Sequence, residues 1–431
     1  MTTNTAADAA EVFTPKYRRN VLLLLTAVYT VNFVDRQILS ILLEPVKHAL
    51  ELSDTQLGFL SGIAFAIFYA TLGIPIAMLA DRYNRRRIIT LSLSLFSLMT
   101  AVCGFVTNFW QLAVARIGVG IGEAGTSPPS HSIISDLYPR EERASALAFF
   151  SLGVNAGILI GFLVGGWVNV YFGWRITFLT VGLPGLLLAI FVRYWLREPP
   201  RGYADGHTKT VETPPIKEVL RYLWGRRAFI HIALATALSS FIGYGAIAWL
   251  PSFLARSHGL DTGQSGTALA LIIGIAGGCG TYMGGVLADK LSKRDVRWNM
   301  WLPVLAALIG VPFSVAFYLV DDTVFALILY AISAVVSLFY LGPSFAMCQA
   351  IAEPRMRAVT AALLLFILNI IGLGLGPQTV GILSDLLETG FGQDSLRYSL
   401  LIVNIFGLWA MVHFMCAARH LKDNLDRVGE R

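Results

Sequence analysis

Apolar residues run along most of this 431-residue chain in long blocks separated by short polar stretches. A helix needs about 20 apolar residues to cross the roughly 30 Å hydrocarbon core of a bilayer. Such a segment must be helical, because lipid offers no hydrogen-bond partner to the backbone. The pattern predicts twelve membrane-spanning helices, at residues 19–47, 55–80, 87–107, 109–137, 143–171, 175–196, 227–256, 264–289, 299–320, 323–350, 357–387 and 396–419.

The longest internal polar stretch follows the sixth predicted helix and contains four prolines. It predicts a linker between two six-helix bundles. Within it, Ile216–Trp224 has leucine, tyrosine and tryptophan at helical spacing, as expected of a short surface helix. The predicted parts are a cytosolic tail at 1–18, an N-terminal bundle at 19–196, a linker at 197–226, a C-terminal bundle at 227–419 and a second cytosolic tail at 420–431.

The two halves repeat each other. The letters "LAD" stand at a helix end in "GIPIAMLADRYNRRR" (73–87) and again in "GGVLADKLSKR" (284–294), each time followed by basic residues. Aligning Arg143 with Arg357 also aligns Asn155 with Asn369. Repeated halves are typical of carriers that work by alternating access, so we expect an all-α fold of two pseudo-symmetric bundles.

Composition and charge agree with a membrane protein. Hydrophobic residues make up 55% of the chain and charged residues only 14%, too few for a soluble protein of this size. With the N-terminus inside, 27 of the 33 lysines and arginines fall in cytoplasmic stretches. This bias predicts cytoplasmic termini in a cell membrane, and it explains the net charge of +6 without a nucleic-acid partner.

Two motifs resemble a known family. "LADRYNRRR" resembles the loop between helices two and three of the major facilitator superfamily, and "RIGVGIGEAGTSPPSHSIISDLYPREERASAL" with "VNFVDRQILS" resembles its spinster branch. The resemblance implies the superfamily fold. It also implies transport. Animal members of the spinster branch export sphingosine-1-phosphate or lysophospholipids, and the resemblance leaves the substrate of this chain open. It places a cytoplasmic gate at Asp81, with Arg85 and Arg86 beside it and Asp289 in the second copy.

Asp35 and Arg36 interrupt the first apolar block. The 14 residues Val21–Val34 span only about 21 Å as a helix, so the helix must continue and carry both charges into the membrane. A charge there is costly unless it is paired or faces a wet cavity. Adjacent helical residues point about 100° apart, so one charge can face a cavity while the other reaches a neighbouring helix.

Helix four supplies partners in Arg116 and Glu123, two turns apart on one face. We predict a charge switch in which Asp35 or Glu123 titrates. Asp35 is the preferred proton carrier, and Arg36 or Arg116 is its counter-ion and the anchor for an anionic headgroup, since arginine binds phosphate through two oxygens. The alternative is a set of static ion pairs that hold helices one and four together.

The C-terminal helices carry almost no charge in their interiors, which suits the apolar part of an amphiphile. The candidate cavity residues there are Ser239, Tyr244, Trp249, Phe339, Tyr340 and Asn369. Aromatic residues at such spacing also occur as packing or lipid-facing side chains. In helix five Gly153, Gly157 and Gly161 form a smooth face for helix packing, either a gating surface between the halves or a static contact.

The predicted function is secondary active transport by alternating access, coupled to protons, of a lysolipid-like or sphingoid-phosphate-like anion. A symporter of a small carboxylate or sugar acid is the alternative. The chain has no P-loop for ATP, no HExxH or GxSxG motif of a hydrolase, and no Cys/His spacing of a zinc site. We therefore expect a transporter and not an enzyme, with no cofactor or metal. We expect it to act as a monomer whose partners are its substrate, protons and membrane lipid.

Overall fold

The computed structural model describes residues 13–204 and 214–429. Most of the expected N-terminal tail, residues 205–213 of the expected linker and the last two residues of the expected C-terminal tail lie outside the described residues. Within the described ranges every regular element is a helix. The first of them, α2 (Pro15–Leu50), begins inside the predicted tail and runs through the whole first span.

Nine helical stretches in the described part of the chain are long and apolar enough to cross a membrane. Two of them, α8 (Arg140–Trp195) and the run Pro354–Arg427, each contain two of the predicted spans. The turn inside α8 lies at Gly173, whose φ of 79° suits glycine because it has no Cβ. A further predicted span is broken into α6 (Phe109–Glu123) and α7 (Ser127–Leu137). These helices accommodate all twelve predicted spans.

The chain divides into two compact units, one of residues 1–38 and 67–210 and the other of residues 39–66 and 211–431. The division differs from the predicted bundles at residues 39–66, the end of α2 and the helices that follow it, which belong to the second unit. The first unit contains the start of α2, most of α4 (Ile63–Arg82), α5 (Arg85–Cys103), α6, α7 and α8.

The glycine face of α8 packs against α2 inside the first unit. A Cβ added at Gly157 would lie 2.4 Å from Phe33 Cβ and 2.7 Å from the Thr30 carbonyl oxygen. Gly153 and Gly161 meet neighbouring turns of α2 in the same way. The absence of side chains therefore sets how closely the two helices approach. The face expected to slide between the halves is occupied by a helix of its own unit, and a gating role for it stays a prediction.

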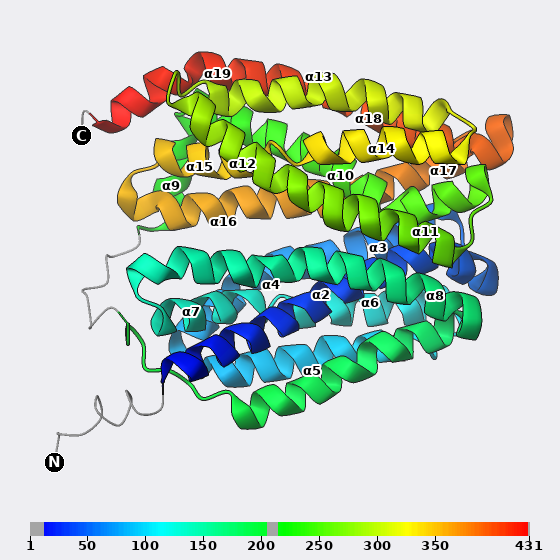
Figure 1. Cartoon of the computed structure of the whole chain (residues 1–431), viewed down its shortest axis with the longest axis horizontal. Coiled ribbons are helices and arrows are strands. Elements are labelled where there is room, and N and C mark those ends of the chain that lie inside the picture. Colours follow the sequence, from blue (N-terminus) through cyan, green and yellow to red (C-terminus); the bar gives the residue numbers. More distant parts are fainter. Residues whose placement is uncertain (1–12, 205–213, 430–431) are drawn as a thin grey trace. The chain divides into compact units, whose positions relative to one another are not determined.

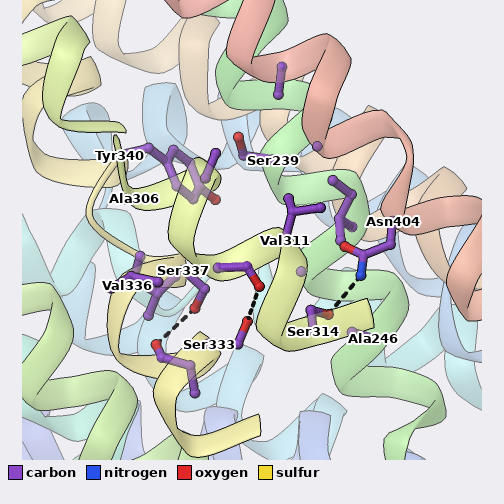
Figure 2. Close-up of a pocket in the computed structure, with 18 of the residues that line it drawn as sticks. Ser239, Ala246, Ala306, Val311, Ser314, Ser333, Val336, Ser337, Tyr340 and Asn404 are labelled. Carbon is purple, nitrogen blue, oxygen red and sulfur yellow. Dashed lines mark hydrogen bonds between the residues drawn. The ribbon is translucent and has the colours of Figure 1, made fainter. Parts of the chain in front are cut away.

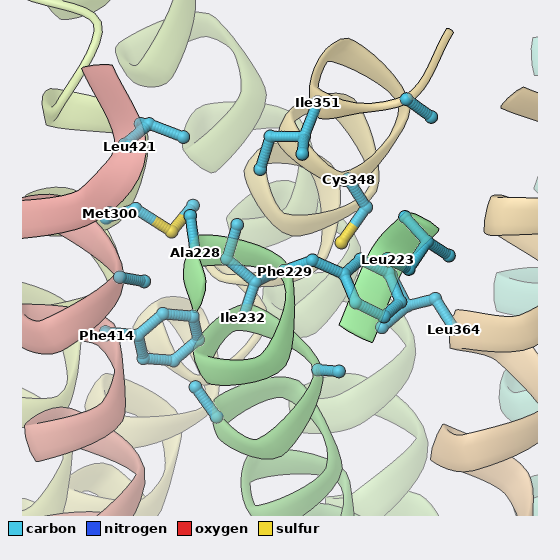
Figure 3. Packing of buried hydrophobic residues seen from close by; sticks show 14 of the residues in the cluster. Leu223, Ala228, Phe229, Ile232, Met300, Cys348, Ile351, Leu364, Phe414 and Leu421 are labelled. Carbon is cyan, nitrogen blue, oxygen red and sulfur yellow. The ribbon is translucent and has the colours of Figure 1, made fainter. Parts of the chain in front are cut away.

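The second unit is also helical. Its elements are α3 (Asp54–Ser61), α9 (Ile216–Trp224), α10 (Arg227–His258), α11 (Thr262–Leu269), η1 (Ala270–Gly277), α12 (Gly278–Ser292), α13 (Trp298–Leu319), α14 (Thr323–Ser337), α15 (Leu341–Ile351), η2 (Pro354–Met356), α16 (Arg357–Leu368), η3 (Asn369–Leu375), α17 (Gly376–Phe391), η4 (Gly392–Asp394), α18 (Ser395–Asn404) and α19 (Phe406–Gly429). α10 and α13 both pack against α19 (Figure 1). Their shared core includes Ile232, Met300 and Phe414 (Figure 3). The η1 and η3 segments are π-helical, a wide form often found at functional sites.

Candidate functional site

The first unit holds a direct ion pair between α2 and α6. Arg36 Nε donates a hydrogen bond of 2.7 Å to Glu123 Oε2, and the two side chains are 11% and 0% exposed. The guanidinium also lies over two aromatic rings, 4.8 Å from the centre of Phe33 and 4.4 Å from that of Tyr69. Ring faces attract cations. Glu123, Phe33 and Tyr69 thus all contribute to holding Arg36.

Asp35 is held differently. Its Oδ1 accepts a hydrogen bond of 2.6 Å from the Thr100 hydroxyl of α5. Its Oδ2 lies 4.0 Å from Arg116 Nη1 of α6 and has no hydrogen-bond partner among the described residues. Both charged side chains are almost completely buried. The Asp35 carboxylate therefore has one oxygen held by a hydroxyl and one that only approaches its counter-ion.

The four predicted charges therefore come together in one cluster, and each α2 charge pairs with a charge on α6. Asp35 and Arg36 point to different neighbours, as expected of adjacent helical residues. Asp35 has Arg116 as its counter-ion, while Arg36 pairs with Glu123. The geometry contains one tight and one loose ion pair, an arrangement in which the loose carboxylate is the easier one to separate from its partner.

Sequence reasoning missed several neutral members of this cluster. Besides Thr100, the hydroxyl of Thr126 donates a hydrogen bond of 3.1 Å to Asn32 Oδ1, and both side chains are buried. Thr126 lies in the break between α6 and α7, next to the Pro128–Pro129 pair. Threonines and asparagines are common in membrane helices, so their presence in the sequence gave no signal. Only Asn32, three residues from Asp35 and one turn away, could have been noticed from its spacing.

The residues assigned to a cytoplasmic gate differ in burial and in their partners. Arg85 is fully buried and donates hydrogen bonds to Asp136 of α7, to Glu198 Oε1 at 2.7 Å and to the Pro199 carbonyl at 2.8 Å. Arg86 donates its backbone N–H to the other Glu198 oxygen at 3.0 Å. Both arginines thereby hold the chain that leaves α8 against the start of α5. Neither acidic partner, Asp136 or Glu198, was predicted from the sequence.

Asp81 and Asp289 are exposed at the ends of α4 and α12. Near the second of them, Asp295 forms an ion pair of 2.8 Å with Arg297 and one of 3.0 Å with Lys422 of α19. Hydrogen bonds from Arg297 hold the pKa of the Asp295 carboxyl below its ordinary value. In this part of the second unit the described ion pairs lie at Asp295 and not at Asp289, and the gate role of Asp81 and Asp289 stays a prediction.

A second charge cluster lies within the second unit and was missed by the sequence analysis. Arg256 of α10 lies 2.6 Å from Asp54 Oδ2 and 2.7 Å from Glu44 Oε1. Lys47 lies 2.7 Å from Asp54 Oδ1. The Asp385 carboxylate accepts the backbone N–H of Asp54 at 2.9 Å, at the start of α3, where a negative charge is favoured. Five charged residues thus join α2, α3, α10 and α17.

The second unit also encloses a pocket lined mainly by α10, α13, α14 and α19 (Figure 2). Its volume is about 170 Å³, an order of magnitude more than the roughly 10–15 Å³ that one water needs. Several of its polar groups bond to protein. Asn404 Nδ2 donates to Ser314 Oγ at 2.7 Å, and Ser333 donates to the Gly310 carbonyl at 3.1 Å. The remaining surface is largely aliphatic, which suits a hydrocarbon ligand.

Two of the six predicted cavity residues, Ser239 and Tyr340, line this pocket. Trp249 is fully buried and donates a hydrogen bond of 2.9 Å to the Pro377 carbonyl, a packing contact between α10 and α17. Phe339 packs in a small core with α12 and α13 residues. Asn369 is buried at the start of η3, and Tyr244 is partly exposed on α10. A metal-binding group of three or more His, Cys, Asp or Glu residues is absent from the described ranges.

Comparison with known proteins identifies the family of the chain. Residues 25–377 match the model of the Major Facilitator Superfamily. The chain is 34% identical to an MFS-type efflux pump of Mycolicibacterium smegmatis, with 93% of each chain covered, and 25% identical to a hexuronate transporter of Bacillus subtilis, with 92% of this chain and 94% of the relative covered.

A solved structure is also similar. It is a bacterial homolog to the human lysosomal transporter Spinster, in an inward-facing and unoccupied conformation. Its sequence is 32% identical to this chain, and the two structures superpose with a TM-score of 0.88. The match covers 95% of this chain and 99% of the other. Together with the helical units and the paired charges inside the membrane, these matches show that the chain belongs to the Major Facilitator Superfamily, as a transporter of the spinster type.

Proposed function

We propose that this transporter couples proton movement to the export or import of an amphiphilic anion. The observation that carries the coupling is the unequal pairing in the first unit. Glu123 is bound to Arg36 at 2.7 Å, whereas Asp35 lies 4.0 Å from Arg116. Ionisable residues inside membranes commonly serve proton relays. Asp35 is the proton carrier, and Glu123 holds Arg36 in place.

Protonation of Asp35 would change the charge of the cluster by one unit. With Asp35 ionised, two arginines face two carboxylates and the four charges cancel. With Asp35 neutral, the cluster carries one net positive charge. A guanidinium in low dielectric then favours a phosphate or carboxylate, which it can bind through two oxygens. Proton uptake therefore prepares the cluster for an anionic headgroup.

The pocket of the second unit supports an amphiphile over a small acid. A sugar acid needs several hydrogen-bond partners, because unpaired polar groups are costly to bury. Several polar groups of this pocket already bond to protein, among them Ser333 and Ser337, which donate to backbone carbonyls. An alkyl chain makes no such demand. We propose that this pocket, taken by itself within the second unit, can hold the alkyl chain of an amphiphile.

The alternative substrate class is a small carboxylate or sugar acid. The similarity to a hexuronate transporter favours it, and so do the arginines, which bind any carboxylate. The two classes differ in how ligand binding depends on chain length. We further propose that the protein acts as a monomer in the inner membrane with both termini in the cytoplasm, as the distribution of Lys and Arg indicates.

Thermal unfolding of the purified full chain tests the substrate class. The probes are lysophosphatidic acids of increasing chain length and, in parallel, glucuronate as a small acid. We expect the lysophosphatidic acids to raise the unfolding temperature, with longer chains acting at lower concentration. Stabilisation by glucuronate and not by any lysophosphatidic acid would contradict the amphiphile assignment.

A further inference from the structure

The short helix α9 has two apolar faces, and only one of them is covered by protein. Val219 and Leu223 are buried in the core of the second unit, where Leu223 lies near Phe229 of α10 (Figure 3). Ile216 and Leu220 are each 47% exposed and Trp224 is 80% exposed. These last three residues are four apart in sequence, so they occupy an arc of about 80° on one side of the helix.

The helix is fixed in this orientation by polar contacts. The Tyr222 hydroxyl donates a hydrogen bond of 3.2 Å to the Ile351 carbonyl at the end of α15. On another side Glu218 forms an ion pair of 2.7 Å with Arg355. Because these contacts hold α9 on the protein, its exposed apolar residues are presented outward and cannot turn into the core.

Basic residues flank the exposed arc. Lys217 and Arg221 are both exposed, and they lie about 100° and 140° around the helix from Ile216, next to the position of Trp224. Tryptophan beside lysine and arginine, at the edge of an apolar face, is the pattern of helices that lie in a membrane interface. The charge is complementary to phosphates of anionic lipid.

Chain connectivity sets the position of α9 relative to the bilayer. α9 ends at Trp224, and α10 begins at Arg227 as a helix long and apolar enough to cross the membrane. Only Gly225 and Arg226 separate them. Trp224 therefore lies where a membrane-spanning helix begins. Three apolar side chains form a patch too small for a stable protein interface, which typically buries about 800 Å² on each partner.

We propose that α9 docks on the bilayer surface, with Ile216, Leu220 and Trp224 inserted among the lipid chains and Lys217 and Arg221 on the phosphates of anionic lipids. This site is distinct from the charge cluster and from the apolar pocket, and it does not depend on what the protein transports. Through Glu218–Arg355 and Tyr222–Ile351 the docked helix holds the chain segment at Pro354 that leads into α16.

Spin labels test the docking in the full-length protein, reconstituted into nanodiscs and made cysteine-free apart from the labelled position. One label replaces Leu220, and the control label replaces Asp423, an exposed residue of α19 that takes no part in holding α9. We expect the Leu220 label to be more accessible to oxygen than to a water-soluble nickel chelate, with the order reversed at Asp423. A Leu220 label as accessible to nickel as the control, or inaccessible to both reagents because protein covers it, would overturn the proposal.

Lipid charge provides the second test. In wild-type background the Leu220 label should move deeper when phosphatidylglycerol replaces part of the phosphatidylcholine. The double variant Lys217→Gln/Arg221→Gln should lose that response, since two basic residues near an anionic surface change the docking equilibrium by about 30-fold. An equal response in the double variant would show that these residues do not bind lipid phosphate. The Leu220 label and the double variant change only exposed side chains, and they leave the buried residues Val219 and Leu223 of α9 intact.

Discussion

Arg36 and Glu123 form a tight ion pair between α2 and α6, with 2.7 Å between Arg36 Nε and Glu123 Oε2. The neighbouring pair of Asp35 and Arg116 joins the same two helices at 4.0 Å. Two adjacent residues of α2 thus lie at very different distances from their partners on α6. Under the proposed function we expect the two pairs to have different tasks, one in structure and one in the transport cycle.

Replacing Glu123 should destabilise the protein more than replacing Asp35. Glu123→Gln leaves Arg36 without its carboxylate, and breaking a buried ion pair typically costs about 3–5 kcal/mol. Asp35→Asn is its matched control, because asparagine can still accept the hydrogen bond from Thr100 and the lost ion pair is a loose one. Thermal unfolding of both variants in detergent measures the difference. Equal losses would mean that the two pairs are equivalent.

Arg256→Gln should release α3. The guanidinium bonds Glu44 and Asp54 together, so its loss leaves both carboxylates without their shared cation. We expect faster hydrogen exchange in the backbone of Asp54–Ser61, measured by mass spectrometry. The control is Arg397→Gln, whose partners Asp321 and Asp394 are 86% and 52% exposed, so that these ion pairs contribute little. Unchanged exchange in α3 would show that the cluster does not hold this helix.

Gly157→Ala should loosen the contact between α8 and α2. The added Cβ would lie 2.4 Å from Phe33 Cβ, closer than carbon atoms can pack, so one helix must move. The expected loss of stability is about 1–3 kcal/mol. Gly73→Ala serves as control, because a Cβ there has no atom within 4 Å. An unfolding temperature as high as that of the control would mean that this face is loosely packed.

A side chain that fills the pocket should weaken the binding of substrates with long alkyl chains more than the binding of those with short ones. A Cβ at Gly243 meets no atom within 4 Å, and this residue lines the pocket. Gly243→Leu therefore places a side chain in the space assigned to the alkyl chain. We expect about tenfold weaker binding of a long-chain lysophosphatidic acid, with a short-chain one little changed. Gly390→Leu, at an open position outside the pocket lining, is the control. If Gly243→Leu left the affinity for the long-chain and the short-chain lysophosphatidic acid equally unchanged, the alkyl chain would not bind in this pocket.

The four charges of this cluster could be picked out from the sequence, because an ionisable residue in an apolar block is costly and therefore conspicuous. Span arithmetic placed Asp35 and Arg36 inside the first helix, and seven-residue spacing put Arg116 and Glu123 on one face. It could not decide which charge pairs with which. That choice depends on how α2 is rotated against α6, which is set by side-chain packing over the whole unit.

The cluster at Arg256 and Asp54 escaped prediction for the opposite reason. A charged residue at the end of a membrane-spanning helix costs little free energy. Its presence therefore indicates the topology of the chain but no functional site. The same holds for Asp136 and Glu198, the partners of buried Arg85. The pocket could not be predicted from the sequence either, because a cavity depends on how side chains from several helices pack together in the folded protein. Only Ser239 and Tyr340 among its lining residues were predicted to face a cavity.

Accumulation of substrate driven by a pH gradient in proteoliposomes is the most direct test of proton coupling through Asp35. Wild-type protein and Asp35→Asn are compared in two assays, accumulation under the gradient and exchange of labelled for unlabelled substrate without it. Asparagine imitates the protonated carboxyl, so the variant should keep exchange and lose accumulation. Accumulation by Asp35→Asn at the wild-type level, with the same dependence on the gradient, would contradict the assignment of Asp35 as the proton carrier.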